Sequence, residues 1–149
     1  MTWMVIRSLA GAHRMVRIEK RTYEQAVEQL HQSGTSQARQ RVWDYIASKP
    51  MLYFVQCGSR SCPVPWIMFE DDIPKAMVFT EFERAKQAAF SCMEQSQEVR
   101  VVGLPTNAAS MYITAIAAQG VVEVCFNHGP QRFDAPMEEV LLVVGAMRR

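Results

Sequence analysis

The sequence lacks any long hydrophobic run and any strong excess of charge. Its most apolar stretch near the C-terminus is "VLLVVGAM", whereas a membrane-spanning helix needs about 20 apolar residues. The formal net charge is +1 over 149 residues, and a dedicated nucleic-acid binder usually carries a strongly basic face. We therefore expect no membrane association and no nucleic-acid partner.

Signature motifs of several enzyme classes are also missing. The sequence contains neither the Gly-x-Ser-x-Gly of serine hydrolases nor the Gly-x-Gly-x-x-Gly of dinucleotide-binding folds. The segment "GSRSC" has the small residues of a phosphate loop but lacks its Lys-Ser/Thr pair. We therefore predict no catalytic residue, no cofactor and no metal ligand, and we favour a non-enzymatic role.

The four cysteines show no repeated spacing. Cys57 and Cys62 lie in a Gly/Ser/Pro-rich loop, and such a pair without a second one is a weak zinc pattern. A small thiol-dependent enzyme or redox protein using this loop, with His128 as partner, is the alternative interpretation. Arg60 supports it, because a nearby cation lowers the pKa of a thiol. Without a convincing secretory signal, we expect a reducing, cytoplasmic location.

Residues 1–21 differ in character from the rest of the chain. They are apolar and basic, and no acidic residue precedes Glu19. We expect this segment to be disordered, or the true translation start to be Met15, and we expect residues 22–149 to form a single domain. Charge is also unevenly spread, because residues 1–50 carry a net charge of +4 and the remainder carries −3.

The single domain is expected to begin with a helical hairpin over 22–49. In the first helix, Thr22 and Gln25 have the spacing of a capping box, and Gly34 is a typical stop. The second helix is predicted over about 36–47 and ends before a proline.

The remainder of the chain alternates between extended and helical patterns. Strands are predicted over five ranges: 51–56, 65–70, 75–79, 99–104 and 121–126. The turn "DDIP" pairs the second and third of these in antiparallel fashion. Helices are predicted to follow the last three. The fold class is therefore α+β, or mixed α/β, with about five strands in a mixed sheet, packed helices and the N-terminal helical hairpin.

Two predicted helix starts rest on their capping residues. In "KAMVFTEFERAKQAAF", Thr80 and Glu83 have the spacing of a second capping box, and Asn107 is placed to cap the next helix. Apolar stripes are expected on both helices, and their members are Phe82, Ala85, Ala89, Cys92 and Met93 on the first and Ala108, Met111, Tyr112 and Ala115 on the second. Ile113 and Ile116 extend the apolar surface of the second helix to another side, so we expect this helix to be well buried. The junction at Thr80 is therefore interpreted as a structural device.

Six residues are candidates for an interaction surface. Arg39 and Arg41 belong to the basic helical hairpin, and Trp66 follows the cysteine-containing loop, where a partly exposed tryptophan could anchor a partner. The remaining candidates are the adjacent acids of the predicted turn and a histidine after a strand end, namely Asp71, Asp72 and His128.

The order of these segments resembles the N-terminal domain of the SseB family, named for enhanced serine sensitivity in bacteria. Members of that family carry a "vyvPv" strand, a strand ending in "vFTs" before a helix, and a "GvvvNp" strand. The matching positions here are Leu52 to Gln56, Val78 to Thr80 and Gly120 to Asn127. The resemblance covers roughly residues 36–145. The chain departs from the pattern in its long cysteine-containing loop and in His128, where the family has proline.

The resemblance implies a bacterial, cytoplasmic protein and no catalytic residues that could be transferred to this chain. Together with the missing enzyme motifs, it favours a non-catalytic binding or regulatory module that acts through contacts with a protein partner. Self-association into a homodimer is compatible with this interpretation.

Overall fold

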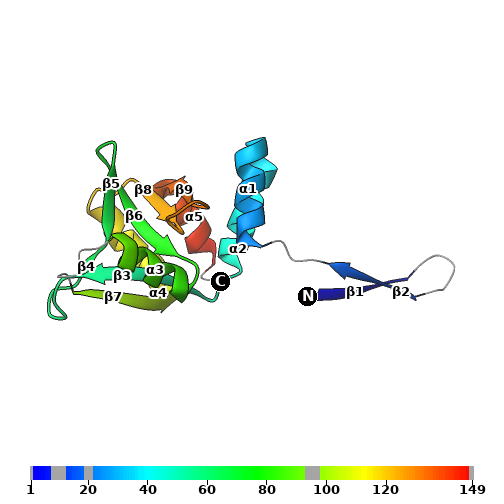
Figure 1. Cartoon of the computed structure of the whole chain (residues 1–149), viewed down its shortest axis with the longest axis horizontal. Coiled ribbons are helices and arrows are strands. Elements are labelled where there is room, and N and C mark those ends of the chain that lie inside the picture. Colours follow the sequence, from blue (N-terminus) through cyan, green and yellow to red (C-terminus); the bar gives the residue numbers. More distant parts are fainter. Residues whose placement is uncertain (1, 8–12, 19–21, 93–97, 148–149) are drawn as a thin grey trace.

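A computed structural model describes residues 2–7, 13–18, 22–92 and 98–147 of the chain, the first two ranges by their backbone alone. The fold is α+β, as predicted, with five helices and a seven-stranded mixed sheet. A separate two-stranded sheet, β1 (Thr2–Arg7) and β2 (His13–Ile18), pairs antiparallel at the N-terminal end of the chain (Figure 1). No regular structure was predicted there.

The predicted helical hairpin is confirmed as α1 (Tyr23–Ser33) and α2 (Ser36–Ala47). The hydroxyl of Thr22 accepts a hydrogen bond from the Gln25 backbone, and the Gln25 side chain accepts one from the Thr22 backbone. Gly34 then ends α1 with φ of 63°, a left-handed conformation that glycine adopts without steric cost. These local hydrogen bonds explain why the hairpin could be predicted from sequence.

The sheet contains seven strands rather than the predicted five. Its strands are, in chain order, β3 (Met51–Cys57), β4 (Val64–Pro65), β5 (Ile67–Glu70), β6 (Ile73–Phe79), β7 (Val99–Pro105), β8 (Glu123–Phe126) and β9 (Phe133–Pro136). The sequence analysis missed β4, which has two residues, and β9, whose sequence "FDAP" includes poor strand formers. Both strands depend on pairing with a neighbour rather than on their own pattern.

Strand β3 lies near the centre of the sheet, between β7 on one side and β6 on the other. Strand β6 continues to β8, and β8 to β9. The pairing of β6 with β8 is parallel, whereas every other described pair is antiparallel. Strands β5 and β6 form the predicted hairpin, and Asp71 and Asp72 turn the chain with φ of 51° and 63°.

Helices cover the two faces of the sheet unequally. The larger core lies on the face that packs against α1, α2, α4 (Thr106–Ala118) and α5 (Met137–Ala146). At its centre, the Trp43 ring meets the rings of Phe126 and Phe133 edge-on, with centroids 5.5 and 5.1 Å away. Of the described helices, only α3 (Phe82–Cys92) packs on the opposite face, through Ala85, Ala88 and Ala89. Helix α3 therefore stands by itself on one side of the sheet.

The predicted Thr80–Glu83 capping box is wrong. Thr80 is buried, with 2% of its surface exposed, and its hydroxyl pairs with Asn127. Helix α3 begins two residues later, at Phe82. The Thr80 hydroxyl forms its hydrogen bonds with a residue distant in the sequence rather than with the start of the helix. The sequence pattern alone does not distinguish a local cap from such a distant partner.

The predicted apolar stripes are also partly wrong. On α3, Phe82 is 46% exposed and Cys92 is exposed as well, while Met93 lies outside the described residues. On α4, Met111 is 66% exposed, whereas Ile113 and Ile116 are buried, as predicted, together with Ala109 and Ser110. Helix α4 also begins earlier than predicted, with Pro105 rather than Asn107 at the cap position. Because α4 is apolar around most of its circumference, its composition does not define which side faces the sheet.

Candidate functional site

The ends of β6 and β8 lie side by side because these two strands are parallel neighbours. The backbone N–H of Asn127 donates to the carbonyl of Val78 at 2.9 Å, which extends this pairing one residue beyond β8. In sheets with parallel strands, ligands usually bind outside the carboxyl ends of the strands. Here, both the start of α3 and the turn after β8 leave from that edge.

Thr80 and Asn127 fix this edge. Asn127 Oδ1 accepts a hydrogen bond from the Thr80 backbone N–H at 3.0 Å, and Asn127 Nδ2 donates to Thr80 Oγ1 at 3.0 Å. Asn127 has a φ of 52°, a left-handed conformation that is uncommon outside glycine. The hydrogen bonds to Thr80 offset the strain of this conformation and hold the following turn in place.

A pocket of about 390 Å³ lies between α3 and this turn. We call it the α3 pocket. It is lined by Arg84, Gln87, Ala88, Ser91 and Cys92 of α3 and by Asn127, His128, Gly129, Pro130 and Gln131 of the turn. The lining is polar and apolar in equal measure, and no acidic side chain contributes to it among the described residues.

Arg84 lies at the end of the pocket nearest the start of α3. Its Nη2 forms an ion pair with Glu24 of α1, and its Nε lies 3.6 Å from Glu81 Oε2. The guanidinium lies over the ring of Tyr23, with its carbon 5.3 Å from the ring centroid. Burial raises the pKa of the Tyr23 hydroxyl well above its usual value. Arg84 is therefore held between α1 and α3 by charge and by ring stacking.

His128 lies opposite, in the turn after β8. Its ring is half-buried and meets Trp66 edge-on, with centroids 6.4 Å apart. The Nδ1 atom is buried and has no hydrogen-bond partner among the described residues. The structure thus brings two of the predicted surface residues together, but Trp66 also stacks on Phe79 at 6.4 Å and belongs in part to the core.

The other flank of α3 exposes two aromatic side chains. Phe82 is 46% exposed and Phe90 is 86% exposed, and their i, i+8 spacing places them on one side of the helix. The ring of Phe82 meets Tyr53 of β3 at 6.2 Å. Strand β7 lies beyond β3 at the margin of the sheet and pairs with no other described strand (Figure 1).

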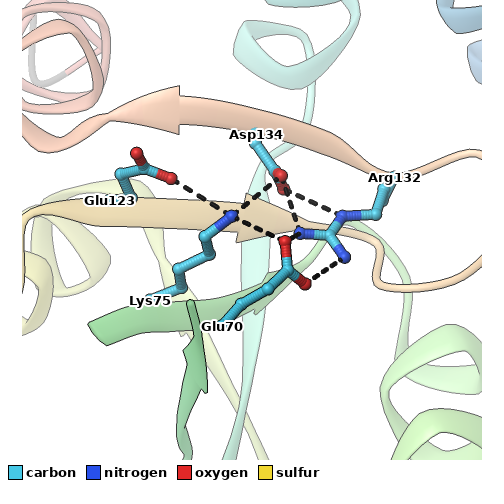
Figure 2. A network of polar contacts seen from close by, with 5 residues as sticks. All are labelled: Glu70, Lys75, Glu123, Arg132 and Asp134. Carbon is cyan, nitrogen blue, oxygen red and sulfur yellow. Dashed lines mark hydrogen bonds and ion pairs between the residues drawn. The ribbon is translucent and has the colours of Figure 1, made fainter. Parts of the chain in front are cut away.

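A network of five charged side chains occupies the sheet face beyond α3 (Figure 2). Lys75, which is 6% exposed, contacts three carboxylates: Glu70 at 3.1 Å, and Glu123 and Asp134 at 3.3 Å each. Arg132 binds Glu70 at 2.8 Å and Asp134 at 2.7 Å.

The network is electrically close to balanced, with two cations facing three carboxylates. Burial alone would lower the pKa of Lys75, but its carboxylate partners outweigh burial and raise it. A lysine that stays protonated is a poor nucleophile or base. We therefore assign the network a structural role. It covers a part of this sheet face on which no described helix packs.

The helical hairpin does not present Arg39 as a free basic surface. Arg39 binds Glu139 of α5 through two hydrogen bonds of 2.8 and 2.6 Å, and its guanidinium lies 4.8 Å above the ring of Phe133. The Trp43 indole donates to the same carboxylate at 2.5 Å. Arg41 donates to Gln29 of α1 at 3.0 Å. Arg39 therefore joins α2 to α5 inside the domain.

The remaining predicted residues are not gathered into one site. Asp71 and Asp72 are exposed at the β5–β6 turn. Cys62 is exposed and Cys57 is half-buried in β3, where burial raises the pKa of its thiol. The pocket that contains His128 includes Cys92 rather than either of these cysteines. This arrangement gives no support to a Cys57/Cys62 thiol site.

Sequence reasoning missed Arg84, Phe90 and Lys75. Phe82, Lys86 and Phe90 recur at intervals of four residues, which could have indicated a separate flank of α3. Lys75 could have been noticed as a lone charge beside the apolar run "AMVF". The position of Arg84 against the turn after β8 had no such signal.

Within the described residues, no group of three or more His, Cys, Asp or Glu side chains is placed to bind a metal ion. None of the helices in the described part of the chain combines the length and hydropathy needed to cross a bilayer. Neither a protein-family model nor a curated protein sequence matches the chain.

Proposed function

We propose that the chain is a non-catalytic binding module that recognises an extended segment of a protein partner at the margin of its sheet. The observation that carries the proposal is the exposure of Phe82 and Phe90 on α3, a helix that contacts β7, whose outer edge pairs with no described strand. We call Phe82, Lys86, Phe90 and the outer edge of β7 the docking face. A cytoplasmic role as an SseB-like domain is part of the proposal, and it rests on the sequence resemblance.

The edge of β7 is suited to pairing with another strand. Its seven residues pair with β3 in continuous register from Val99 to Pro105, without a bulge. Sheet edges that avoid pairing usually carry a bulge, an internal proline or lysine residues. Strand β7 has its proline only at its last position. An added strand would therefore find a straight row of backbone donors and acceptors.

The exposed aromatic side chains supply the second part of the contact. A phenylalanine that is 86% exposed leaves most of its apolar surface in water, and burial of that surface by a partner is favourable by about 25 cal/mol per Å². Lys86 lies between the two rings in sequence and favours a partner that carries a carboxylate among its apolar side chains. The expected partner is an extended segment with alternating apolar residues and at least one acid.

The test selects peptides from a random library displayed on phage, using the whole chain as bait. We expect the selected peptides to alternate apolar residues, and to lose at least about tenfold in affinity against Phe90→Asp. Met111→Asp is the matched control, because Met111 is also exposed but lies on α4. Methylation of alternate peptide N–H groups separates strand addition from simple aromatic contact, because it removes backbone hydrogen bonds alone. The proposal fails if Phe90→Asp binds the peptides as well as Met111→Asp does.

A further inference from the structure

We propose that the α3 pocket binds a small oxyanion, carried by a carboxylate or a phosphate group. Arg84 and His128 would face the anion, with amide and hydroxyl groups of α3 and the turn completing the site. This inference goes beyond the proposed docking of a protein partner, and it concerns the opposite flank of α3.

The hydrogen-bond donors that line the pocket are the first observation in favour of an anion. Arg84 supplies a guanidinium, and Gln87, Ser91 and Gln131 supply amide and hydroxyl groups. Arginine is a donor only, so its preferred ligand is a group that accepts hydrogen bonds. No described acidic side chain contributes to the lining, so inside the pocket an anion would meet the Arg84 guanidinium and neutral donors, while Glu24 and Glu81 contact that guanidinium from outside the lining.

Two buried nitrogen atoms at the pocket lack hydrogen bonds within the described residues, Arg84 Nε and His128 Nδ1. Buried polar atoms are paired in the great majority of cases, and exceptions require an explanation. Both atoms belong to residues that line the same pocket, on its two opposite walls. An oxyanion between α3 and the turn would offer an acceptor to the Arg84 Nε–H, and to His128 Nδ1 when that nitrogen carries the proton.

The ion pairs that Arg84 forms within the protein do not engage all of its hydrogen-bond donors. Glu24 engages Nη2, while Glu81 Oε2 stays 3.6 Å from Nε, beyond hydrogen-bond length. Glu81 is itself held by the Tyr45 hydroxyl, which donates to Oε1 at 3.0 Å. The two glutamates therefore orient the guanidinium, and Nε keeps no hydrogen-bond partner among the described residues.

The turn that forms the second wall is fixed before any ligand binds. Asn127 has a φ of 52° and Gly129 a φ of 140°, two conformations that most residues avoid. The buried hydrogen bonds between Asn127 and Thr80 hold the first of them. Backbone strain of this kind is concentrated at functional sites, and a preformed wall reduces the entropy lost on binding.

The test is a titration of the whole, isotope-labelled chain followed by NMR, at constant ionic strength. One arm uses inorganic phosphate and the other uses succinate. We expect the Arg84 Nε–H and His128 side-chain resonances to shift saturably, with a Kd of about 1 mM or tighter. Saturation by phosphate alone identifies a phosphate site, saturation by succinate alone a carboxylate site, and saturation by both an oxyanion site with little discrimination. Shifts that rise linearly in both arms would overturn the proposal.

Variants separate this pocket from general charge attraction. Arg84→Gln should weaken binding at least about tenfold, since a charge-assisted hydrogen bond is lost. Gln87→Ala is a second variant on an exposed position, used if Arg84→Gln does not fold, and it should weaken binding measurably. Arg60→Gln removes an equal charge from a different, exposed loop and should leave the Kd unchanged. The proposal is overturned if Arg60→Gln weakens binding as much as the pocket variants do, or if no pocket variant weakens it.

Discussion

The side chains of Thr80 and Asn127 hydrogen bond to each other in the interior, although 47 residues separate them in the sequence. Each is at most 3% exposed. Thr80 follows β6 and Asn127 follows β8, so the contact joins the ends of the two parallel strands. It also sets the backbone of the turn that forms one wall of the α3 pocket.

The first prediction concerns the strength of this contact. Asn127→Ala should lower the free energy of unfolding by about 2–4 kcal/mol, because buried hydrogen bonds to Thr80 are lost and alanine is strained at positive φ. Urea unfolding followed by far-ultraviolet circular dichroism gives the difference.

Asn127→Gly separates the two causes, because glycine tolerates the left-handed conformation but makes no side-chain hydrogen bond. We expect it to be more stable than Asn127→Ala by about 1 kcal/mol. Equal stability of the two variants would contradict the role of the positive φ at this position.

The second prediction concerns acid pH. Hydrogen bonds from Arg39 hold the pKa of Glu139 below its ordinary value of 4.5. The folded chain therefore keeps this carboxylate charged to a lower pH than the unfolded chain does. The resulting stabilisation is fully present above about pH 5 and is lost as the pH falls through the folded pKa. In Glu139→Gln, the free energy of unfolding should consequently fall less steeply as the pH is lowered.

The control for this prediction is Arg39→Gln, which removes the cause and keeps the carboxyl group. Like Glu139→Gln, it should make the free energy of unfolding fall less steeply as the pH is lowered. The double variant should behave much like either single variant. Thermal unfolding between about pH 5 and pH 2 measures all four proteins. If Arg39→Gln keeps the wild-type slope, Arg39 is not the cause of the lowered pKa.

The third prediction addresses the charge network. Lys75→Met removes the central cation, so that Glu123 loses its ion-pair partner while Arg132 still binds Glu70 and Asp134 (Figure 2). We expect a loss of about 2 kcal/mol in stability, below the value for a fully buried ion pair because the carboxylates are partly exposed. Adding Glu123→Gln should recover part of the loss, as measured by denaturant unfolding. A second change that deepens the loss would speak against charge repulsion as its origin.

The fourth prediction tests the thiols. Burial raises the pKa of Cys125 to about 12, and it also raises the pKa of Cys57. With a chromogenic disulfide reagent at about pH 8, the exposed Cys62 and Cys92 should react first, Cys57 more slowly, and Cys125 only after unfolding. Mass spectrometry of the labelled peptides assigns each rate. A Cys57 that reacts faster than a free peptide thiol would instead revive the thiol-enzyme alternative.

The fifth prediction compares two glycines. A Cβ atom at Gly103 of β7 would come within 2.8 Å of the Tyr53 ring, whereas one at Gly145 of α5 would meet no atom within 4 Å. Gly103→Ala should therefore destabilise the chain by about 1 kcal/mol or more. Gly145→Ala should stabilise it by about 0.5–1 kcal/mol, because alanine favours the helix. A melting temperature that Gly103→Ala leaves unchanged or raises would contradict the packing of Tyr53 against Gly103.

Much of the fold follows from short stretches of sequence. The capping box of α1, its glycine stop and the β5–β6 hairpin each depend on residues within a few positions of one another. All five predicted helices and five of the seven strands of the main sheet have counterparts in the structure. Their patterns could be recognised because the hydrogen bonds that create them are local.

The candidate sites could be predicted only in fragments. Trp66 and His128 were selected singly, and the structure places their rings together. Arg39 was selected as a free charge, but it binds a carboxylate that lies 100 residues away in the sequence. Arg84 and Phe90 were not selected, because a helical pattern does not reveal which flank meets the sheet.

The sequence by itself determined the order and the approximate position of most helices and strands, through caps, turns and apolar periodicity. Only the tertiary structure decided which partner each polar side chain finds. Thr80 illustrates the difference, because its spacing to Glu83 predicted a local cap, whereas the parallel pairing of β6 and β8 brings Asn127 to its hydroxyl. A local hydrogen bond competes with a buried distant one, and the outcome depends on how the whole sheet assembles.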